Sequence, residues 1–116
     1  MRITERRLGH SSILDVAGDL TYANRAAFKG AVERSKQAGC RHLIINMEDV
    51  RFLDSSALGM LALLSQSLTV TQRAVSLLKP QSYIKEIISL ANLHRILPVY
   101  NTEEDALARY RLPVVG

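Results

Sequence analysis

The first twenty residues alternate between polar and apolar types in a way that predicts two β-strands. Ile3 to Leu8 is a charged, weakly alternating segment, which is typical of a strand at the edge of a sheet. Residues 9–11 predict a turn, and Ser12 to Ala17 then places Leu14 and Val16 on one face. Because the connection is short, we expect the two strands to pair as an antiparallel hairpin.

Two later segments are apolar almost without interruption. His42 to Met47 includes three consecutive aliphatic residues, and Val75 to Leu78 is a second short run. Runs of this kind predict strands that are buried on both faces. The stretch from Ser55 to Gln72 lies between them and predicts a helix, so this crossover should make the two strands parallel. Leu97 to Tyr100 predicts a short final strand.

Three further segments carry the period of amphipathic helices. The first follows Thr21, a suitable N-cap, and ends at Gly39. The second, Ser82 to Ala91, ends before Asn92, a residue type that tolerates the left-handed conformation. The third opens with residues 102–105, Thr-Glu-Glu-Asp, which resemble a capping box. The apolar stripes are Ala27, Phe28, Ala31, Val32 and Ala38 in the first helix; Ile84, Ile87, Ile88 and Ala91 in the second; and Ala106, Leu107 and Tyr110 in the third.

These elements predict a single α/β domain that spans residues 1–116. A chain of this length can bury one hydrophobic core but not a second. We expect a mixed β-sheet of about five strands with an N-terminal antiparallel hairpin, packed against about four α-helices. The tail after about residue 111 is expected to be loosely attached.

The charge pattern argues against nucleic acid as the partner. The net charge is +4 and the pI is near 9.6, but the eleven arginines and four lysines are scattered, with only Arg6 and Arg7 adjacent. No aromatic residue alternates with them, as a stacking platform for bases requires. A modestly basic surface is better suited to faster encounter with an acidic protein.

The sequence also predicts a cytoplasmic protein without membrane insertion. No apolar segment follows the charged N-terminus, so we expect no secretory signal. The apolar run from Ala57 to Leu64 is too short to cross a bilayer. Cys40 is the only cysteine, which excludes an intrachain disulfide and favours a reducing compartment; we expect it to be an inert buried thiol.

Neither a metal site nor a catalytic site is evident. The histidines, His10, His42 and His94, are far apart and have no ligand-spaced partners, so we expect them at the surface or partly buried. The acids Asp15, Asp19, Asp49 and Asp54 lack the context of a catalytic triad or carboxylate pair, and solvated loop positions explain them. No glycine-rich phosphate loop is present, so we expect the chain itself to bind no nucleotide. We predict a protein that is not an enzyme and needs no cofactor.

The most informative segment is Asp54-Ser55-Ser56, at the start of the central helix. All three residues are strong N-cap types, because their side-chain oxygens accept from backbone N–H groups of the first turn. A phosphoserine is also tolerated there, because the helix dipole favours an anion. The triplet alone therefore fits either a simple cap or a phosphorylation site.

The central helix has apolar residues off its main face. Helical projection places Ala57, Leu61, Leu64 and Leu68 together and Met60 and Leu63 away from them. Either Met60 and Leu63 form a docking patch, or the sheet and a neighbouring helix cover them.

With these elements in place, nearly the whole chain resembles a STAS domain of the anti-sigma factor antagonist family. The landmarks are Gly18-Asp19-Leu20, the segment from Asn46 to Val50, the turn from Phe52 to Ser56, Ala91-Asn92-Leu93, and the segment from Glu103 to Leu107. The chain departs from the family where Ala57 replaces a common Gly and where Asn46 and Thr21 replace common acids.

The resemblance implies a phosphorylation switch at Ser55. The unmodified serine, on a flat surface beside a loop from Gly18 to Thr21, would bind an anti-sigma factor that is a serine kinase of the histidine-kinase-like ATPase type. A serine phosphatase of the PP2C type would restore it. The predicted docking residues are Gly18, Asp19, Leu20, Thr21, Asp54, Ser55 and Ser56, to which the helical projection adds Met60 and Leu63.

The predicted function is thus an antagonist that releases a sigma factor or another regulator, and the sequence leaves two alternatives open. One is a non-switching STAS subunit of a transporter or stress complex, in which Ser55 only caps the helix. The other is a small hydrolase that uses Ser55 as its nucleophile. The motif offers no general base to activate this serine, which argues against a hydrolase.

Overall fold

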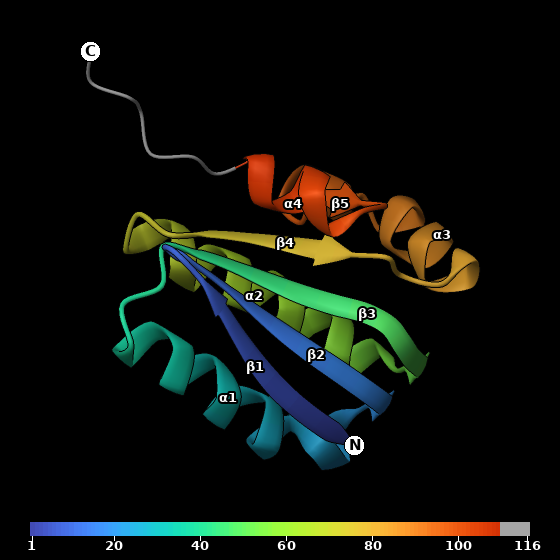
Figure 1. Cartoon of the computed structure of the whole chain (residues 1–116). Coiled ribbons are helices and arrows are strands. Elements are labelled where there is room, and N and C mark those ends of the chain that lie inside the picture. Colours follow the sequence, from blue (N-terminus) through green and yellow to red (C-terminus); the bar gives the residue numbers. More distant parts are fainter. Residues whose placement is uncertain (110–116) are drawn as a thin grey trace.

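The computed structural model describes residues 1–109, which form a five-stranded sheet and four α-helices (Figure 1). The strands lie in the order β1 to β5; β1 and β2 are antiparallel, and every later neighbouring pair is parallel. The strands are β1 (Arg2–Leu8), β2 (Ser11–Leu20), β3 (His42–Leu53), β4 (Ala74–Leu78) and β5 (Val99–Tyr100). The helices are α1 (Arg25–Gln37), α2 (Ser55–Val70), α3 (Ser82–Leu90) and α4 (Glu103–Arg109). The predicted mixed sheet with its N-terminal hairpin is confirmed.

Both central strands run further than the sequence pattern predicts. β2 continues through Gly18 to Leu20, so the prediction of a loop there is wrong, and β3 continues from Met47 to Leu53. Twice along this pair, β3 contributes one extra residue: first between the pairs Asp15–Asn46 and Ala17–Asp49, then between Gly18–Val50 and Asp19–Phe52. Such bulges bend the strands and disturb the alternation of faces.

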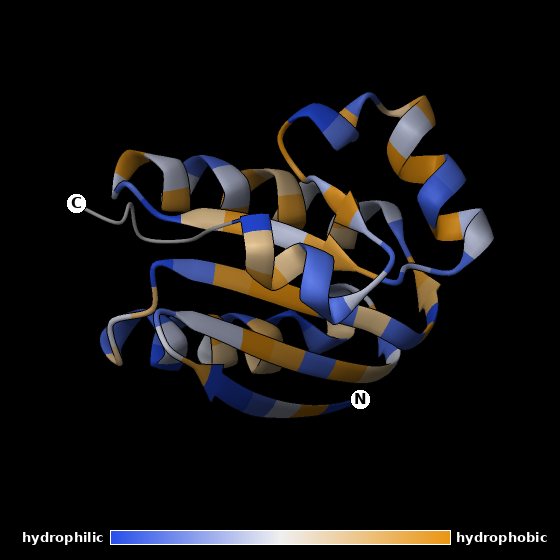
Figure 2. Cartoon of the chain, turned by 45° about the horizontal axis from the view of Figure 1, so that its top comes forward, coloured by the Kyte–Doolittle hydropathy of each residue, from blue (hydrophilic) through white to orange (hydrophobic). Residues whose placement is uncertain are grey.

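The two faces of the sheet bury unequal cores. On one face, α1 and α2 cover a large cluster that includes Phe28 of α1, Leu61 of α2, and Leu14 and Leu43 of the sheet (Figure 1). On the other face, a small cluster of Ile13, Ile44 and Leu78 from the strands packs against Ala106 of α4. Figure 2 shows that the outer strand β1 is mostly hydrophilic, in keeping with a protected sheet edge.

The helices follow the predicted periods with local differences. A 3₁₀ turn, Tyr22–Asn24, precedes α1, and Thr21 provides no side-chain cap. Phe28, Ala31 and Val32 are buried as expected, whereas Ala27 and Ala38 are exposed because the stripe is narrower than the pattern suggests. In α3, Ile84 and Ile88 are buried, Ile87 is half-buried and Ala91 is exposed.

The ends of α3 and α4 agree with their sequence signals. Asn92 adopts φ 60°, the left-handed conformation expected after α3. The Thr102 hydroxyl accepts from the N–H of Asp105 at 3.0 Å, which caps α4. Tyr110 and the tail after residue 111 lie outside the described residues.

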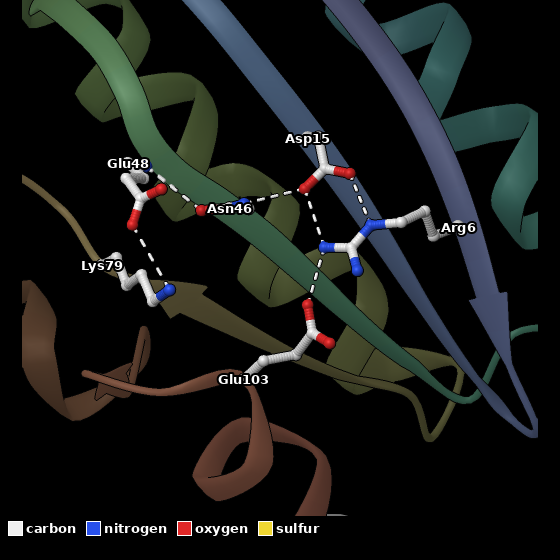
Figure 3. A network of polar contacts seen from close by, with 6 residues as sticks. All are labelled: Arg6, Asp15, Asn46, Glu48, Lys79 and Glu103. Atoms are coloured by element: carbon white, nitrogen blue, oxygen red, sulfur yellow. Dashed lines mark hydrogen bonds and ion pairs between the residues drawn. The ribbon is translucent and has the colours of Figure 1, made fainter.

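A polar network holds α4 to the strands (Figure 3). The guanidinium of Arg6 donates to Asp15 through Nε at 2.6 Å and through Nη2 at 3.0 Å, and Nη2 lies 2.7 Å from Oε1 of Glu103 at the start of α4. Asn46 Nδ2 donates to Asp15 Oδ1 at 2.7 Å. The Arg6 guanidinium, the largest cause, and Asn46 lower the pKa of Asp15. The prediction that Asp15 is a solvated loop acid is therefore wrong: it lies within β2 and accepts these bonds.

Candidate functional site

The acid of the Asp54-Ser55-Ser56 triplet is the residue that caps α2. Asp54 has extended backbone angles, and its Oδ1 accepts from the N–H of Ala57 at 2.8 Å. Ser55 and Ser56 are the first two helical residues, and their side chains are exposed. Within residues 1–109, neither serine hydroxyl forms a hydrogen bond. The sequence left the capping role open among three residues, and the geometry gives it to Asp54.

The same carboxylate holds the connection between β2 and α1 against α2. Oδ2 of Asp54 accepts from the backbone N–H of Tyr22 at 3.1 Å, and the N–H of Asp54 donates to the carbonyl of Leu20 at 3.4 Å. Thr21 and Tyr22 therefore lie beside the start of α2. The structure thus brings Thr21, which the sequence predicted to lie near Ser55, next to the start of α2.

Not all of the residues predicted to dock a partner are accessible. Leu20 has an exposed fraction of 0% and belongs to the core, because it pairs with Leu53 at the end of the sheet. Gly18 has φ +102°, which favours glycine, and a Cβ there would lie 3.4 Å from Cα of Met1. Asp19 is exposed, and its carbonyl accepts from Asn24 Nδ2 at 2.6 Å. Gly18 and Leu20 therefore support the backbone beneath the site and offer no side chain for a partner to contact.

The surface next to the triplet, between α1 and α2, is hollowed. A groove of about 570 Å³ runs between α1 and α2 and begins at Thr21, Tyr22 and Ser56. Ala57, Met60, Leu63, Leu64 and Ser67 line its α2 side. Phe28 and Val32 of α1 contribute further apolar surface. Ser55 does not line this groove, so the expectation of a flat surface around Ser55 stays a prediction.

The exposed apolar pair on α2 is confirmed in part. Leu63 has an exposed fraction of 67%, so neither the sheet nor α1 covers it. Met60 is half-buried and packs against the main core. Leu64 was predicted on the buried face, but it is also half-buried and lines the groove; Ser65 occupies the buried position instead. The face that α2 buries is rotated relative to the projected one because the helix carries apolar residues on nearly every side.

Basic side chains from α1 border the groove, although no sequence motif marks them. Arg25 stacks over the ring of Tyr22, with Cζ 3.6 Å from the ring centroid, and its Nη1 donates to the Tyr22 carbonyl at 2.8 Å. Lys36 pairs with Glu33 at 3.2 Å, and Lys29 lies between these two groups. The one sequence feature that points to this contact is the spacing of Tyr22 and Arg25, three positions apart near the start of a helix.

The other candidate groups have structural roles. His42 was expected at or near the surface, but it is fully buried: its Nε2 and the Ser76 hydroxyl lie 2.7 Å apart, and burial lowers its pKa to about 4. Cys40 is a buried thiol, as predicted, and burial raises its pKa. In the part of the chain that the structure describes, no three His, Cys, Asp or Glu side chains are grouped to hold a metal ion.

A polar cluster around the carboxylate of Glu5 lies between β1 and α1. Glu5 accepts from the hydroxyls of Ser12 and Ser35, and its pKa is lowered chiefly by the hydrogen bond from Ser12 and then by that from Ser35. Ser12 and Ser35 are fully buried, so their hydroxyls need this acceptor. The cluster therefore stabilises the packing of α1 on the sheet.

No helix within residues 1–109 is long and apolar enough to cross a membrane.

Similar proteins share the fold over most of this chain. A Thermotoga maritima protein whose name assigns it to the anti-sigma factor antagonists is 27% identical over 94 residues, which cover 80% of this chain and 83% of that protein. The crystal structure of a Thermotoga maritima protein with the same assignment superposes with a TM-score of 0.86 at 24% identity, covering 95% of each chain.

The Bacillus cell fate determinant SpoIIAA has the same fold in a phosphorylated and an unphosphorylated form. The phosphorylated form gives a TM-score of 0.73 at 20% identity and covers 95% of this chain and 100% of its own. The unphosphorylated form gives 0.72 at 18% identity, with 93% and 96% covered. The family model described as "STAS domain" matches residues 2–106. The chain therefore belongs to the STAS domain family.

Proposed function

We propose that this protein is a phosphorylation-switched anti-sigma factor antagonist that acts in the cytoplasm. With Ser55 unmodified, it binds an anti-sigma factor that is also a serine kinase of the histidine-kinase-like ATPase type, and so releases a sigma factor or another regulator. Phosphorylation of Ser55 ends the binding, and a PP2C-type phosphatase reverses it. In this role the chain has no catalytic activity of its own.

The single observation that carries the proposal is the division of roles between Asp54 and Ser55. Asp54 provides the cap, whereas the Ser55 hydroxyl is exposed on the first residue of α2. A phosphate on Ser55 would lie at the positive end of the helix dipole without displacing the cap. The modification can then change the surface and leave the fold intact.

The effect on binding is electrostatic. A phosphate beside the Asp54 carboxylate concentrates negative charge at the end of the groove where Ser56 lies. Reducing partner occupancy from about nine in ten to about one in ten requires a loss of roughly 2.6 kcal/mol in binding free energy. One desolvated like-charge contact supplies an effect of this size, so no large conformational change is needed.

The alternative of a non-switching STAS subunit has less support. It assigns Ser55 only a capping role, but the α2 cap is formed by Asp54. Nothing in the described residues favours a transporter or a stress complex as the host assembly. Co-purification with a membrane ATPase, with no phosphate incorporated, would favour it.

The direct test is intact-mass measurement of the chain purified from its own cells, followed by phosphopeptide mapping. We expect one phosphate, which Ser55→Ala abolishes and Ser56→Ala retains. The neighbouring serine is a matched control, since it is also exposed and in the same helical turn. A phosphate that maps mainly to Ser56 or Thr21, or its complete absence, would contradict the proposal.

A further inference from the structure

The groove between α1 and α2 has an apolar floor and one basic edge. Helix α2 contains no charged residue and contributes Met60 and Leu64 to the groove, with Leu63 at its edge. From α1, Phe28 and Val32 extend this apolar surface. The charged side chains at the groove come from α1: three are cations, Arg25, Lys29 and Lys36, and one is the acid Glu33. A ligand that matches this arrangement is apolar along its length and carries a negative charge.

Lys29 is the cation that remains available for such a charge. Arg25 already binds the ring and carbonyl of Tyr22, and Lys36 pairs with Glu33. Among residues 1–109, Lys29 makes no ion pair or side-chain hydrogen bond. It therefore provides an unneutralised ammonium in the middle of the α1 edge.

The dimensions fit a small ligand with few polar groups. A volume of about 570 Å³ lies within the usual range of small-molecule sites. The α1 edge from Arg25 to Lys36 extends for about three helical turns, or about 16 Å. The polar side chains of α2 at the groove are the hydroxyls of Ser56 and Ser67, too few to read a nucleobase, whereas an aliphatic chain needs no hydrogen-bond partner.

We propose that this groove binds an unbranched aliphatic carboxylate of medium chain length, with the chain on the apolar floor and the carboxylate at Lys29. Both parts of the ligand match the site: burial of methylenes supplies affinity, and the ammonium selects the anion. The site is distinct from the Ser55 hydroxyl, and its occupancy does not require phosphorylation. A failure of the chain to bind this carboxylate can therefore be distinguished from a failure of the proposed phosphorylation switch.

Gly59 offers a way to fill the groove without disturbing the fold. It lines the groove from the second turn of α2, and apart from its chain neighbours and the nearby backbone of its own helix, no heavy atom lies within 4 Å of the position that a Cβ would take. Its φ is not positive, so other residues fit the backbone, and replacing glycine within a helix raises helix propensity. Gly59→Phe would place a ring in the groove, and Gly59→Ala is the matched control with the same backbone effect.

The experiment is a calorimetric titration of the full chain with sodium decanoate, hexanoate and neutral decan-1-ol, each below self-association. We expect saturable 1:1 binding of decanoate, with a roughly two- to fourfold loss of affinity for each methylene removed. Lys29→Gln should weaken decanoate binding about three- to fivefold and leave decan-1-ol unchanged. Gly59→Phe should abolish binding, and Gly59→Ala should retain it.

Three results would overturn this assignment. Unsaturable uptake of decanoate would show partition onto apolar surface with no site. Equal binding by the Gly59→Phe and Gly59→Ala variants would place the ligand elsewhere. No binding by the folded wild-type chain would leave the groove as a face for protein docking only.

Discussion

The carboxylate of Asp54 accepts the backbone N–H of Tyr22 at 3.1 Å, although the two residues are 32 positions apart. Its other oxygen accepts from Ala57 at 2.8 Å. One side chain thus begins α2 and fixes the entry to α1. The acid next to the proposed phosphorylation site is therefore a structural residue as well as a source of charge.

Asp54→Ala should destabilise the fold by about 1–2 kcal/mol, because it removes a helix cap and leaves the Tyr22 N–H without its acceptor. Ser55→Ala should change the free energy of unfolding by less than about 0.5 kcal/mol, since its hydroxyl is exposed. Urea denaturation of both variants checks this. An equal loss for Ser55→Ala would show that the serine shares the capping role.

Ser55→Asp should weaken binding of the anti-sigma partner while the fold stays as stable as wild type. A carboxylate in the first helical turn is neutral or favourable for the helix dipole, but it adds negative charge to the docking surface. A binding titration with the partner and a urea melt give the two readouts, and Ser55→Asn is the uncharged control. Undiminished binding by Ser55→Asp would refute the charge argument.

The leucines of α2 should separate by burial. Leu61 has an exposed fraction of 0%, so Leu61→Ala should cost about 2–5 kcal/mol in folding. Leu63→Ala should cost little in stability but lower partner affinity, because its side chain is accessible beside the groove. Half-buried Leu64 should fall between them in thermal melts. A Leu63→Ala protein that melts as early as Leu61→Ala would show that this side chain supports the core.

Stability should fall in two stages as the pH decreases. The unfolded pKa of histidine is about 6.5, and that of buried His42 is about 4, so the unfolded state binds more protons between these values. His42 therefore removes up to about 3 kcal/mol as the pH falls from about 6.5 to about 4. Glu5 and Asp15 have lowered pKa values, so their contribution is lost only below the ordinary carboxyl range.

Urea denaturation at a series of pH values checks these two stages. His42→Gln should flatten the upper stage and leave the lower one in place. A wild-type stability that is constant from about pH 7 to about pH 4 would contradict the assignment to His42.

Arg6→Met should loosen α4 selectively. The substitution removes contacts to both Asp15 and Glu103, but Arg6 is partly exposed, so the global cost should be only about 0.5–1 kcal/mol. Amide exchange in α4 should become faster than in α2. Lys79→Met is the control, since it breaks an ion pair with Glu48 that does not involve α4 (Figure 3). Similar exchange of α4 in both variants would show that Arg6 does not hold the helix.

Most of the fold could be predicted from the sequence because local signals and tertiary packing agree. The apolar runs beginning at His42 and Val75 form the buried parallel strands, and Asn92 takes the left-handed turn that its residue type favours. The end of β3 could not be predicted. Its buried residues beyond Met47 are Val50 and Leu53, three positions apart, and this spacing fits neither a regular strand nor an isolated turn.

The candidate site was less predictable because it combines distant segments. Three neighbouring residues could each cap α2, and only the backbone angles of Asp54 and its hydrogen bond from the Ala57 N–H decide among them. The groove depends on how α1 and α2 pack, and Lys29 gains its significance from the pairing of Arg25 and Lys36. Likewise, the burial of His42 depends on Ser76 from the next strand, which offers a hydroxyl at 2.7 Å.

The two extra residues of β3 also limit how the length of this chain can change. Deleting one residue between Met47 and Leu53 would either remove one of the two bulges that bend this pair of strands or shift the register by one residue, which would turn Val50 or Leu53 toward solvent. The start of α2 would move by one strand position away from Tyr22. Substitutions on the exposed positions of this segment should be tolerated, whereas single insertions and deletions should not. Variation in length is therefore expected at the surface turns, such as residues 71–73, and not along the path that leads to Ser55.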